Sequence, residues 1–285
     1  MRRWLVSSPM PELPEVEATR RHLEPAVVGR AIAAVEVRRP RMVRYQPDPG
    51  SMSHRMVGRR IEAMGRHGKF LMAELEGDLT WVSHLGMSGR FELGVEGADE
   101  APHTNVVVRL DDGIEVRLVD PRTFGFVAVF TPDELAESTL SRLGPDALDS
   151  LPPVTSLRTA LTGRSAPIKA LLLDQRLIAG IGNIYADEML WRAEISPLRP
   201  GGSLLADEVA ALRRAVRPVL TAGLRSGGTS LGDLAYLLPD GRAGEHMSRL
   251  EAYGRNGEVC RRCGTTMVRN VIRQRSSHWC PGCQK

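Results

Sequence analysis

The pattern of apolar and polar positions changes along the chain. Residues 15–29 place apolar side chains at helical spacing and end at a glycine, which predicts one helix. Beyond residue 30, short segments rich in valine and aromatic residues alternate with glycine or Asp-Gly turns, a pattern typical of antiparallel strands. The expected strands lie within residues 31–39, 69–77, 79–87, 104–113, 114–120 and 124–130. The first half of the chain is therefore predicted to be an antiparallel β-sandwich or flattened barrel.

From about residue 131 the apolar spacing becomes helical. The expected helices lie within residues 132–143, 167–178, 183–195 and 204–228. Residues 143–154 carry three prolines and are the natural boundary between two domains. The pattern predicts an α+β multidomain fold, with an N-terminal sandwich flanked by helices over 10–145, a helical domain over 146–250 and a small module over 251–285.

Length and composition indicate an ordinary globular protein. At 285 residues the chain can form two domains with normal cores, and 42% of its residues are hydrophobic and 25% charged. The apolar run at residues 4–6 is too short for a secretory signal, and no later run approaches the about 18 apolar residues that a membrane helix needs. We therefore expect a soluble cytoplasmic protein.

Positive charge is concentrated at the C-terminal end. Residues 241–285 contain nine lysines and arginines against three acidic residues, a balance of +6, whereas the rest of the chain carries −2. A cationic block of this kind suits a polyanion such as a nucleic acid. A solvated basic tail is the alternative that charge alone leaves open.

Four cysteines lie in one C-x2-C, sixteen-residue, C-x2-C pattern near the C-terminus, and they are Cys260, Cys263, Cys280 and Cys283. Two such knuckles can bring four thiolates to one tetrahedral Zn²⁺, and four protein ligands close its coordination shell, which indicates a structural ion. Disulfide pairing is the alternative, which a reducing compartment disfavours. Residues 267–279 between the knuckles are expected to form a β-hairpin that presents three arginines. Because zinc ribbons also bind proteins, the motif indicates metal more firmly than DNA.

Five motifs occur in a fixed order: PELPEVE, HLGMSG, DPRTFG, GIGNIYADE and the four-cysteine ending. In this combination the chain resembles formamidopyrimidine-DNA glycosylase of the bacterial Fpg/Nei family, a base-excision enzyme for oxidised purines. The resemblance runs from Met10 to Lys285. It implies a catalytic β-sandwich domain over 10–145, a helix-two-turn-helix DNA-binding domain over 146–250 and a zinc finger over 251–285. Residues 1–9 would be a leader or a mis-annotated extension.

The resemblance implies that the nucleophile is the secondary amine of an N-terminal proline, Pro11, once Met10 is removed. In the chain as written the Pro11 nitrogen is a tertiary amide whose lone pair is delocalised, whereas a free α-amino group titrates at a pKa of about 7.7–8.0. We therefore predict that translation begins at Met10 or that the leader is cleaved. A proline that only begins the helix is the alternative. Glu12 matches the acid that protonates the sugar as the base departs.

Other roles follow from the same resemblance. Lys69, Asn183 and Arg275 would hold the DNA backbone, with Lys69 and Arg275 also counted as catalytic. Met87, Arg122 and Phe124 would fill the void that the extruded nucleotide leaves, because extrusion sacrifices stacking and pairing. Ordinary core packing is the alternative for Met87 and Phe124. Further DNA-binding residues would be Lys169, near the damaged base, Tyr185 and His103.

The implied reaction is hydrolysis of the N-glycosidic bond through a Schiff base, followed by β- and δ-elimination, with one structural Zn²⁺ as the expected cofactor. The expected partner is duplex DNA with oxidised bases or abasic sites, bound by a monomer. The alternatives are an endonuclease VIII-like glycosylase for oxidised pyrimidines, a non-catalytic damaged-DNA-binding protein that keeps its leader, and a general zinc-ribbon interaction protein.

Two further features depart from the family pattern. The middle of the 228–250 loop is unusual, which leaves the lesion preference open. Thr123 stands where many members carry a second arginine, which is expected to weaken backbone binding slightly.

Overall fold

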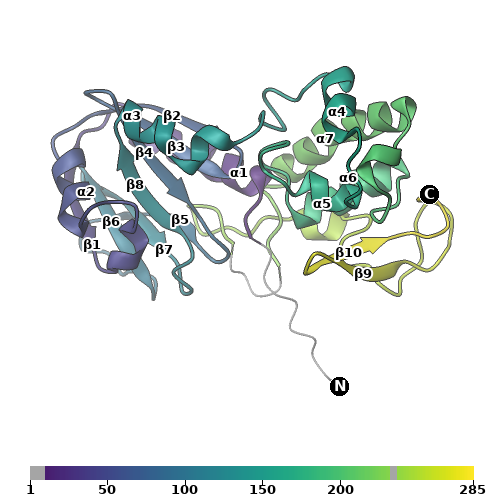
Figure 1. Cartoon of the computed structure of the whole chain (residues 1–285). Coiled ribbons are helices and arrows are strands. Elements are labelled where there is room, and N and C mark those ends of the chain that lie inside the picture. The colour runs from purple at the N-terminus through teal and green to yellow at the C-terminus, as the bar shows by residue number, and fades with distance from the viewer. Residues whose placement is uncertain (1–9, 232–235) are drawn as a thin grey trace. The chain divides into compact units, whose positions relative to one another are not determined.

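The computed structural model describes residues 10–231 and 236–285, which form two compact units (Figure 1). The first unit comprises the described residues up to Ser141 together with Ser226–Glu245. The second comprises Arg142–Arg225 and His246–Lys285. The expected boundary at residue 145 lies close to the observed one. No unit boundary coincides with residue 250, because the cysteine-rich end packs with the helices while residues 226–245 pack with the sandwich.

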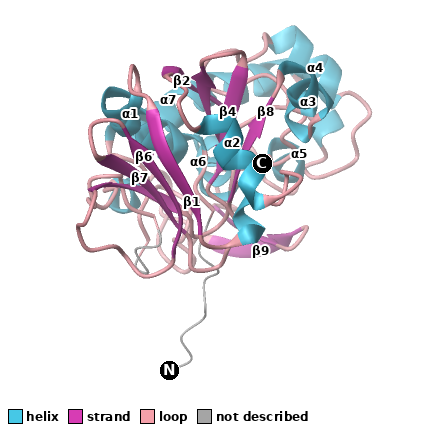
Figure 2. Ribbon diagram, turned by 90° about the vertical axis from the view of Figure 1, so that its left-hand side faces the viewer, coloured by secondary structure: helices cyan, strands magenta, loops and turns pink. Residues whose placement is uncertain are grey.

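Two antiparallel sheets form the first unit and confirm the predicted sandwich (Figures 1 and 2). Their strand orders are β1-β6-β7-β5 and β2-β3-β4-β8. The strands are β1 (Ile32–Val37), β2 (Ile61–His67), β3 (Phe70–Leu75), β4 (Leu79–His84), β5 (Arg90–Val95), β6 (Thr104–Leu110), β7 (Ile114–Val119) and β8 (Phe126–Phe130). One core contains buried side chains of both sheets, so the two sheets share their inner faces.

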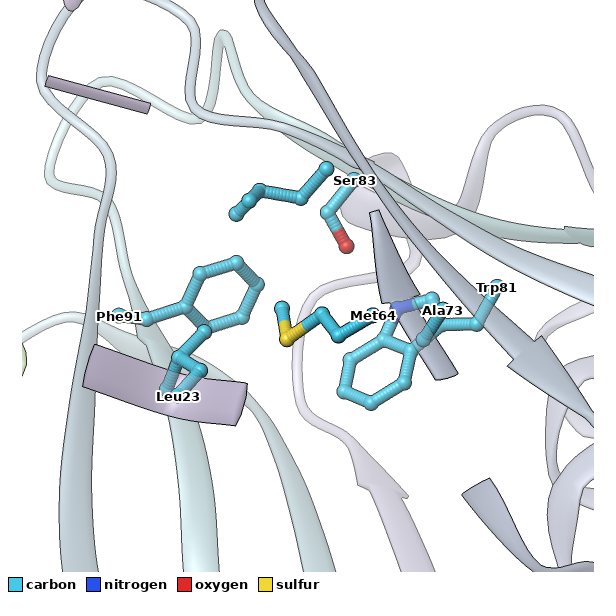
Figure 3. A pocket seen from close by; sticks show the side chains of 7 residues that line it. Leu23, Met64, Ala73, Trp81, Ser83 and Phe91 are labelled. Carbon is cyan, nitrogen blue, oxygen red and sulfur yellow. The ribbon is translucent and has the colours of Figure 1, made fainter. Parts of the chain in front are cut away.

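Helix α1 (Leu13–Val27) closes one edge of this core. Its Val16, Leu23 and Val27, which were expected to form the apolar face, are at most 2% exposed. Figure 3 shows Leu23 beside Phe91 of β5, with Met64 of β2 between them and Trp81 of β4, and these side chains line one small apolar pocket. Side chains of α1 and of both sheets therefore belong to one core, which fixes the helix relative to the strands.

The apolar pattern did not predict the strands β2 and β5 or the short helices α2 and α4 (Val154–Leu161). Gly94 in β5 interrupts the pattern because a Cβ there would lie 2.5 Å from Cζ of Arg117, whose buried guanidinium pairs with Glu115 at 2.7 Å. Helix α2 (Pro49–Met56) has only two buried side chains, and its N-cap Asp48 accepts a hydrogen bond from the Ser51 N–H. Short elements that bury few side chains give little periodic signal.

Three of the four expected helices lie in the second unit, each shorter than expected, whereas the helix expected within 132–143 forms only α3 (Pro132–Glu137), which belongs to the first unit. Helix α6 (Asn183–Ala193) and helix α7 (Ala206–Arg225) pack together. The segment 167–178 forms only the short helix α5 (Ile168–Leu172). Among the described residues, the remaining elements of the two units are α4 (Val154–Leu161), η1 (Pro40–Val43), η2 (Thr139–Arg142), η3 (Gly201–Ser203), η4 (His246–Arg249), β9 (Val268–Ile272) and β10 (Arg275–Trp279).

The predicted hairpin at the C-terminal end is confirmed as the antiparallel pair β9 and β10. Arg273 and Gln274 form its turn, and both have positive φ values, as a two-residue turn between twisted strands requires. Over the described part of the chain, none of the helices combines the length and the hydropathy that crossing a membrane would need.

Candidate active site and zinc centre

The N-terminal candidates lie directly before α1. Pro11 and Glu12 are buried and directly precede the helix, with Glu12 as its N-cap and 1% exposed. The Glu12 N–H donates to Oε2 of Glu15 at 2.9 Å, so a main-chain donor at the helix start is satisfied. The expected nucleophile and acid, which are adjacent in sequence, are therefore both buried where α1 begins.

Glu15 also binds the segment 226–245. Its Oε1 accepts the Thr229 N–H at 2.7 Å, and its carbonyl oxygen accepts the Tyr236 hydroxyl at 3.1 Å. Gly228, with φ +85°, permits this approach, because a Cβ there would lie 2.9 Å from Cγ of Glu15. Burial raises the pKa of Tyr236 and keeps its hydroxyl a donor. Glu15 thus links the start of α1 to the 228–250 loop, whose sequence departs from the family pattern.

The void-filling candidates lie on two loops whose main chains touch. Gly86, with φ +65°, packs so closely that a Cβ would lie 2.4 Å from the Gly125 nitrogen. Asp120 is 0% exposed and its carboxylate accepts the Gly125 N–H at 2.8 Å and the Ser88 hydroxyl at 2.6 Å. The loops 84–89 and 120–125 are therefore joined by glycine contacts and by one buried carboxylate, and they carry Met87, Arg122 and Phe124.

Arg122 and Phe124 contact each other at the surface. The Arg122 guanidinium lies 4.7 Å from the centroid of the Phe124 ring, and Phe124 is 42% exposed. An exposed phenylalanine under a guanidinium is not core packing, so the alternative for Phe124 is excluded by its position. Met87 is half-buried on the neighbouring loop.

Lys69 and His103 lie in turns of the same unit. Lys69 follows Gly68 in the turn between β2 and β3, and it is half-buried. Burial lowers the pKa of His84 to about 4, with further contributions from the charges of Lys69 and Arg44. His103 is exposed, with φ +68°, and its carbonyl oxygen accepts the Asp120 N–H at 3.1 Å.

In the second unit, two of the expected DNA-binding side chains are buried. The Lys169 ammonium is 0% exposed and donates to Oδ1 of Asp187 at 2.7 Å and to the Ser276 carbonyl oxygen at 2.6 Å. Tyr185 is also 0% exposed, and its ring stacks on His246. Contact of these residues with DNA stays a prediction. In this structure Lys169 links α5 to α6 and β10, and Tyr185 packs α6 against η4.

Asn183 and Arg275 occupy ends of elements. Asn183 is the first residue of α6, and its Nδ2 donates to the Ser276 hydroxyl at 3.3 Å. Its buried Oδ1 has no hydrogen-bond partner within the described residues. Arg275 begins β10 and is exposed together with Arg269 and Arg273. The hairpin therefore presents three cations to solvent, as the sequence predicted.

The four cysteines come together as a metal site. Their sulfur atoms all lie within 4.8 Å of one another, with Cys260 and Cys283 3.9 Å apart and Cys263 and Cys280 3.4 Å apart. A tetrahedron with Zn–S bonds of about 2.3 Å has sulfur separations of about 3.8 Å, so the cluster fits one zinc ion. Burial opposes ionisation of Cys260, but hydrogen bonds from Trp191 and from main-chain N–H groups lower its pKa to about 6.

Helix α6 holds this metal module by side chains that motif reasoning missed. The Glu188 carboxylate accepts the N–H groups of Glu251, Ala252 and Tyr253 at 2.8–2.9 Å. One turn later, Trp191 donates its indole N–H to the Cys260 sulfur at 3.5 Å. Glu188 is the last residue of the GIGNIYADE motif and Trp191 follows it. Their partners lie more than 60 residues away in sequence, so motif spacing could not predict these contacts.

The sandwich with its two joined loops, the helical unit and the four-thiolate hairpin define a multidomain zinc-finger protein. Residues 10–127 match the formamidopyrimidine-DNA glycosylase N-terminal domain, residues 143–234 the H2TH domain of that glycosylase, and residues 257–285 the zinc finger found in FPG and IleRS. The chain belongs to the formamidopyrimidine-DNA glycosylase family.

Individual relatives agree with this assignment. The formamidopyrimidine-DNA glycosylase of Roseiflexus sp. is 43% identical over 97% of this chain and 100% of its own length. That of Moorella thermoacetica is 45% identical over 91% of this chain and 94% of its own. The MutM (FPG) structure from Thermus thermophilus has a TM-score of 0.86 at 41% identity, covering 96% of this chain and 98% of its own. The structure of Lactococcus lactis Fpg with DNA that contains an abasic site has a TM-score of 0.88 at 31% identity, covering 96% and 100%.

The contact between the two loops predicts a large cost for a side chain at Gly86. We expect Gly86→Ala to lower the free energy of unfolding by more than about 2 kcal/mol, because its Cβ would overlap Gly125 and Phe124 and the backbone has a positive φ. The control is Gly113→Ala, with φ +83° but no atom within 4 Å of its Cβ, for which only about 1 kcal/mol is expected. Urea unfolding measures both, and equal costs would contradict the close contact.

The buried carboxyl group of Glu188 predicts a pH-dependent stability. Burial raises its pKa to about 7, so the folded state favours the protonated form, and stability is lost as the pH rises from its unfolded pKa of about 4.5 through 7. Relative to Glu188→Gln, the natural protein should lose about 2–3 kcal/mol between pH 5 and pH 8. Denaturant titrations at both pH values measure this difference, and a constant difference would refute the raised pKa.

Proposed function

We propose that this protein is a DNA glycosylase and abasic-site lyase that removes oxidised purines, such as 8-oxoguanine and formamidopyrimidines, from duplex DNA. The observation that carries the proposal is the buried pair Pro11 and Glu12 directly before α1, in a chain that belongs to this glycosylase family. The proposed site of action is the bacterial cytoplasm, where the protein works as a monomer.

Chemistry at this position requires a free imino group. A secondary amine at Pro11 attacks C1′ of the damaged nucleotide and the bond from C1′ to the base breaks, with Glu12 delivering a proton to the sugar ring oxygen as the ring opens. The resulting iminium withdraws electrons from the sugar. Loss of the 3′ and then the 5′ phosphate by elimination leaves a one-nucleotide gap with phosphorylated ends.

This mechanism depends on how the chain begins in the working protein. An amide nitrogen at Pro11 has no available lone pair, so the residues before it must be removed or never translated. The family match begins at residue 10, which supports translation from Met10 followed by removal of that methionine before a small residue.

DNA recognition is proposed to use residues of both units. Met87, Arg122 and Phe124 fill the void in the duplex, and the exposure of Phe124 supports this role. Lys69, Asn183 and Arg275 bind phosphates. The other predicted DNA-binding residues are His103 in the first unit and Lys169 and Tyr185 in the second. The single zinc ion, held by the four cysteines, supports the hairpin that presents Arg275 and takes no part in the reaction.

Borohydride trapping on an 8-oxoguanine:cytosine duplex tests the proposal. Protein that begins at Pro11 should form a covalent adduct with DNA, whereas the chain that retains residues 1–9 should form none, because its Pro11 nitrogen is acylated. Glu12→Gln should bind the duplex and excise the base about 10²- to 10⁴-fold more slowly, since it lacks the acid.

Two outcomes would contradict the assignment. Tight binding of the lesion without any adduct from the Pro11-initiated protein would indicate a damaged-DNA-binding protein without activity. Trapping on duplexes with oxidised pyrimidines in preference to 8-oxoguanine would indicate the endonuclease VIII-like alternative.

A further inference from the structure

Two arginines that no motif includes bind the main chain of the loop 120–125. Arg44 donates to the Gly125 carbonyl oxygen at 2.6 Å and to the Phe124 carbonyl oxygen at 3.1 Å. Arg41, in η1, donates to the Thr123 carbonyl oxygen at 3.2 Å. Three consecutive carbonyl groups around Phe124 are thus held from one side by guanidinium groups about 80 residues away in sequence.

The N–H groups of the same loop are held by a different residue. The Asp120 carboxylate accepts the N–H groups of Arg122 at 3.2 Å and of Gly125 at 2.8 Å. Between these anchors, Thr123 adopts φ +52°, a left-handed conformation that a non-glycine residue with a branched Cβ adopts only when its surroundings enforce it. The loop conformation therefore depends on its anchors and not on the preferences of its own residues.

Arg44 is itself fixed by aromatic rings. Its guanidinium lies 5.2 Å from the centroid of Phe126 and 5.3 Å from that of Tyr45, and these two rings pack edge to face at 4.6 Å. A guanidinium has a flat face that stacks on aromatic rings and a rigid fork of N–H donors that can reach two carbonyl groups, whereas an ammonium group is a compact charge without either feature. The position therefore requires arginine and not just a positive charge.

We propose that Arg44, assisted by Arg41, is a positioning residue that holds the loop 120–125 in the conformation that projects Phe124 outward as the wedge into duplex DNA. The inference rests on the proposed function, because it assigns Arg44 a role that acts through Phe124. A loop held in its inserting conformation before DNA arrives does not have to be ordered during insertion. Arg41 contributes by donating to the carbonyl oxygen of Thr123, the residue that precedes Phe124.

The test compares two substrates that differ in their need for a wedge. Excision of 8-oxoguanine from a duplex leaves a void to be filled, whereas an abasic site in single-stranded DNA has no opposite base and no stack to restore. We expect Arg44→Gln to slow single-turnover excision from the duplex about 10-fold or more, as loss of charged hydrogen bonds would, and to leave strand cleavage at the single-stranded abasic site within about 2-fold.

Three further variants make the comparison specific. Arg44→Lys should not restore duplex excision, because it keeps the charge but not the planar donor. Phe124→Ala should show the same substrate pattern, and the double variant Arg44→Gln with Phe124→Ala should be no slower than Phe124→Ala alone, since both changes remove one function. Arg59→Gln is the matched control, because Arg59 also donates to a main-chain carbonyl, that of Glu76 at 2.7 Å, and it should excise normally.

Several results would contradict the proposed positioning role of Arg44. Equal losses on both substrates would show that Arg44 supports folding or chemistry in general, and additive losses with Phe124→Ala would show that it acts apart from the wedge, for example on a phosphate. Unchanged duplex excision would remove the positioning role. All of these variants are made in protein that begins at Pro11. If that protein without any substitution is inactive on both substrates, the proposed function is refuted, and the role of Arg44 with it.

Discussion

Buried carboxylates that accept main-chain N–H groups hold the candidate functional segments in place. Glu15 binds the N–H groups of Glu12 and Thr229, and Asp120 binds those of the loop that carries Phe124. In the second unit, Asp187 and Glu188 bind N–H groups of β10 and of residues 251–253. Irregular segments cannot satisfy their own donors as helices and sheets do, so a buried acceptor from elsewhere fixes their conformation.

This arrangement explains why acidic residues that take no part in the proposed chemistry are so deeply buried. Asp187 and Asp120 are at most 1% exposed, a position that costs free energy unless each oxygen is hydrogen-bonded or paired. Asp187 meets this requirement with Lys169, the Ser277 hydroxyl and the His278 N–H. Removing one of these partners would leave a buried carboxylate without its hydrogen bond, so the geometry of the segments around Asp187 and Asp120 depends on all of the partners together.

Motifs named the candidate site residues but did not separate those with exposed side chains from those with buried ones. Phe124 and Arg275 are exposed, as a direct contact with DNA requires, whereas the Lys169 and Tyr185 side chains are buried. A sequence pattern records which residue type stands at a position, and a lysine that pairs with a buried aspartate looks the same as one that faces solvent. Arg44 was missed for the converse reason, because its contacts join positions about 80 residues apart and fit no local period.

The sequence by itself determined the sandwich, the main helices, the hairpin and the four zinc ligands, since these follow from local periodicity and from cysteine spacing. It also determined which residues stand at the first turn of α1. Only the tertiary structure decided which loops touch, how residues 226–245 join the first unit and which charged groups are buried. Those features depend on contacts between segments far apart in the chain, whose burial and hydrogen bonding exist only once the strands and helices have packed.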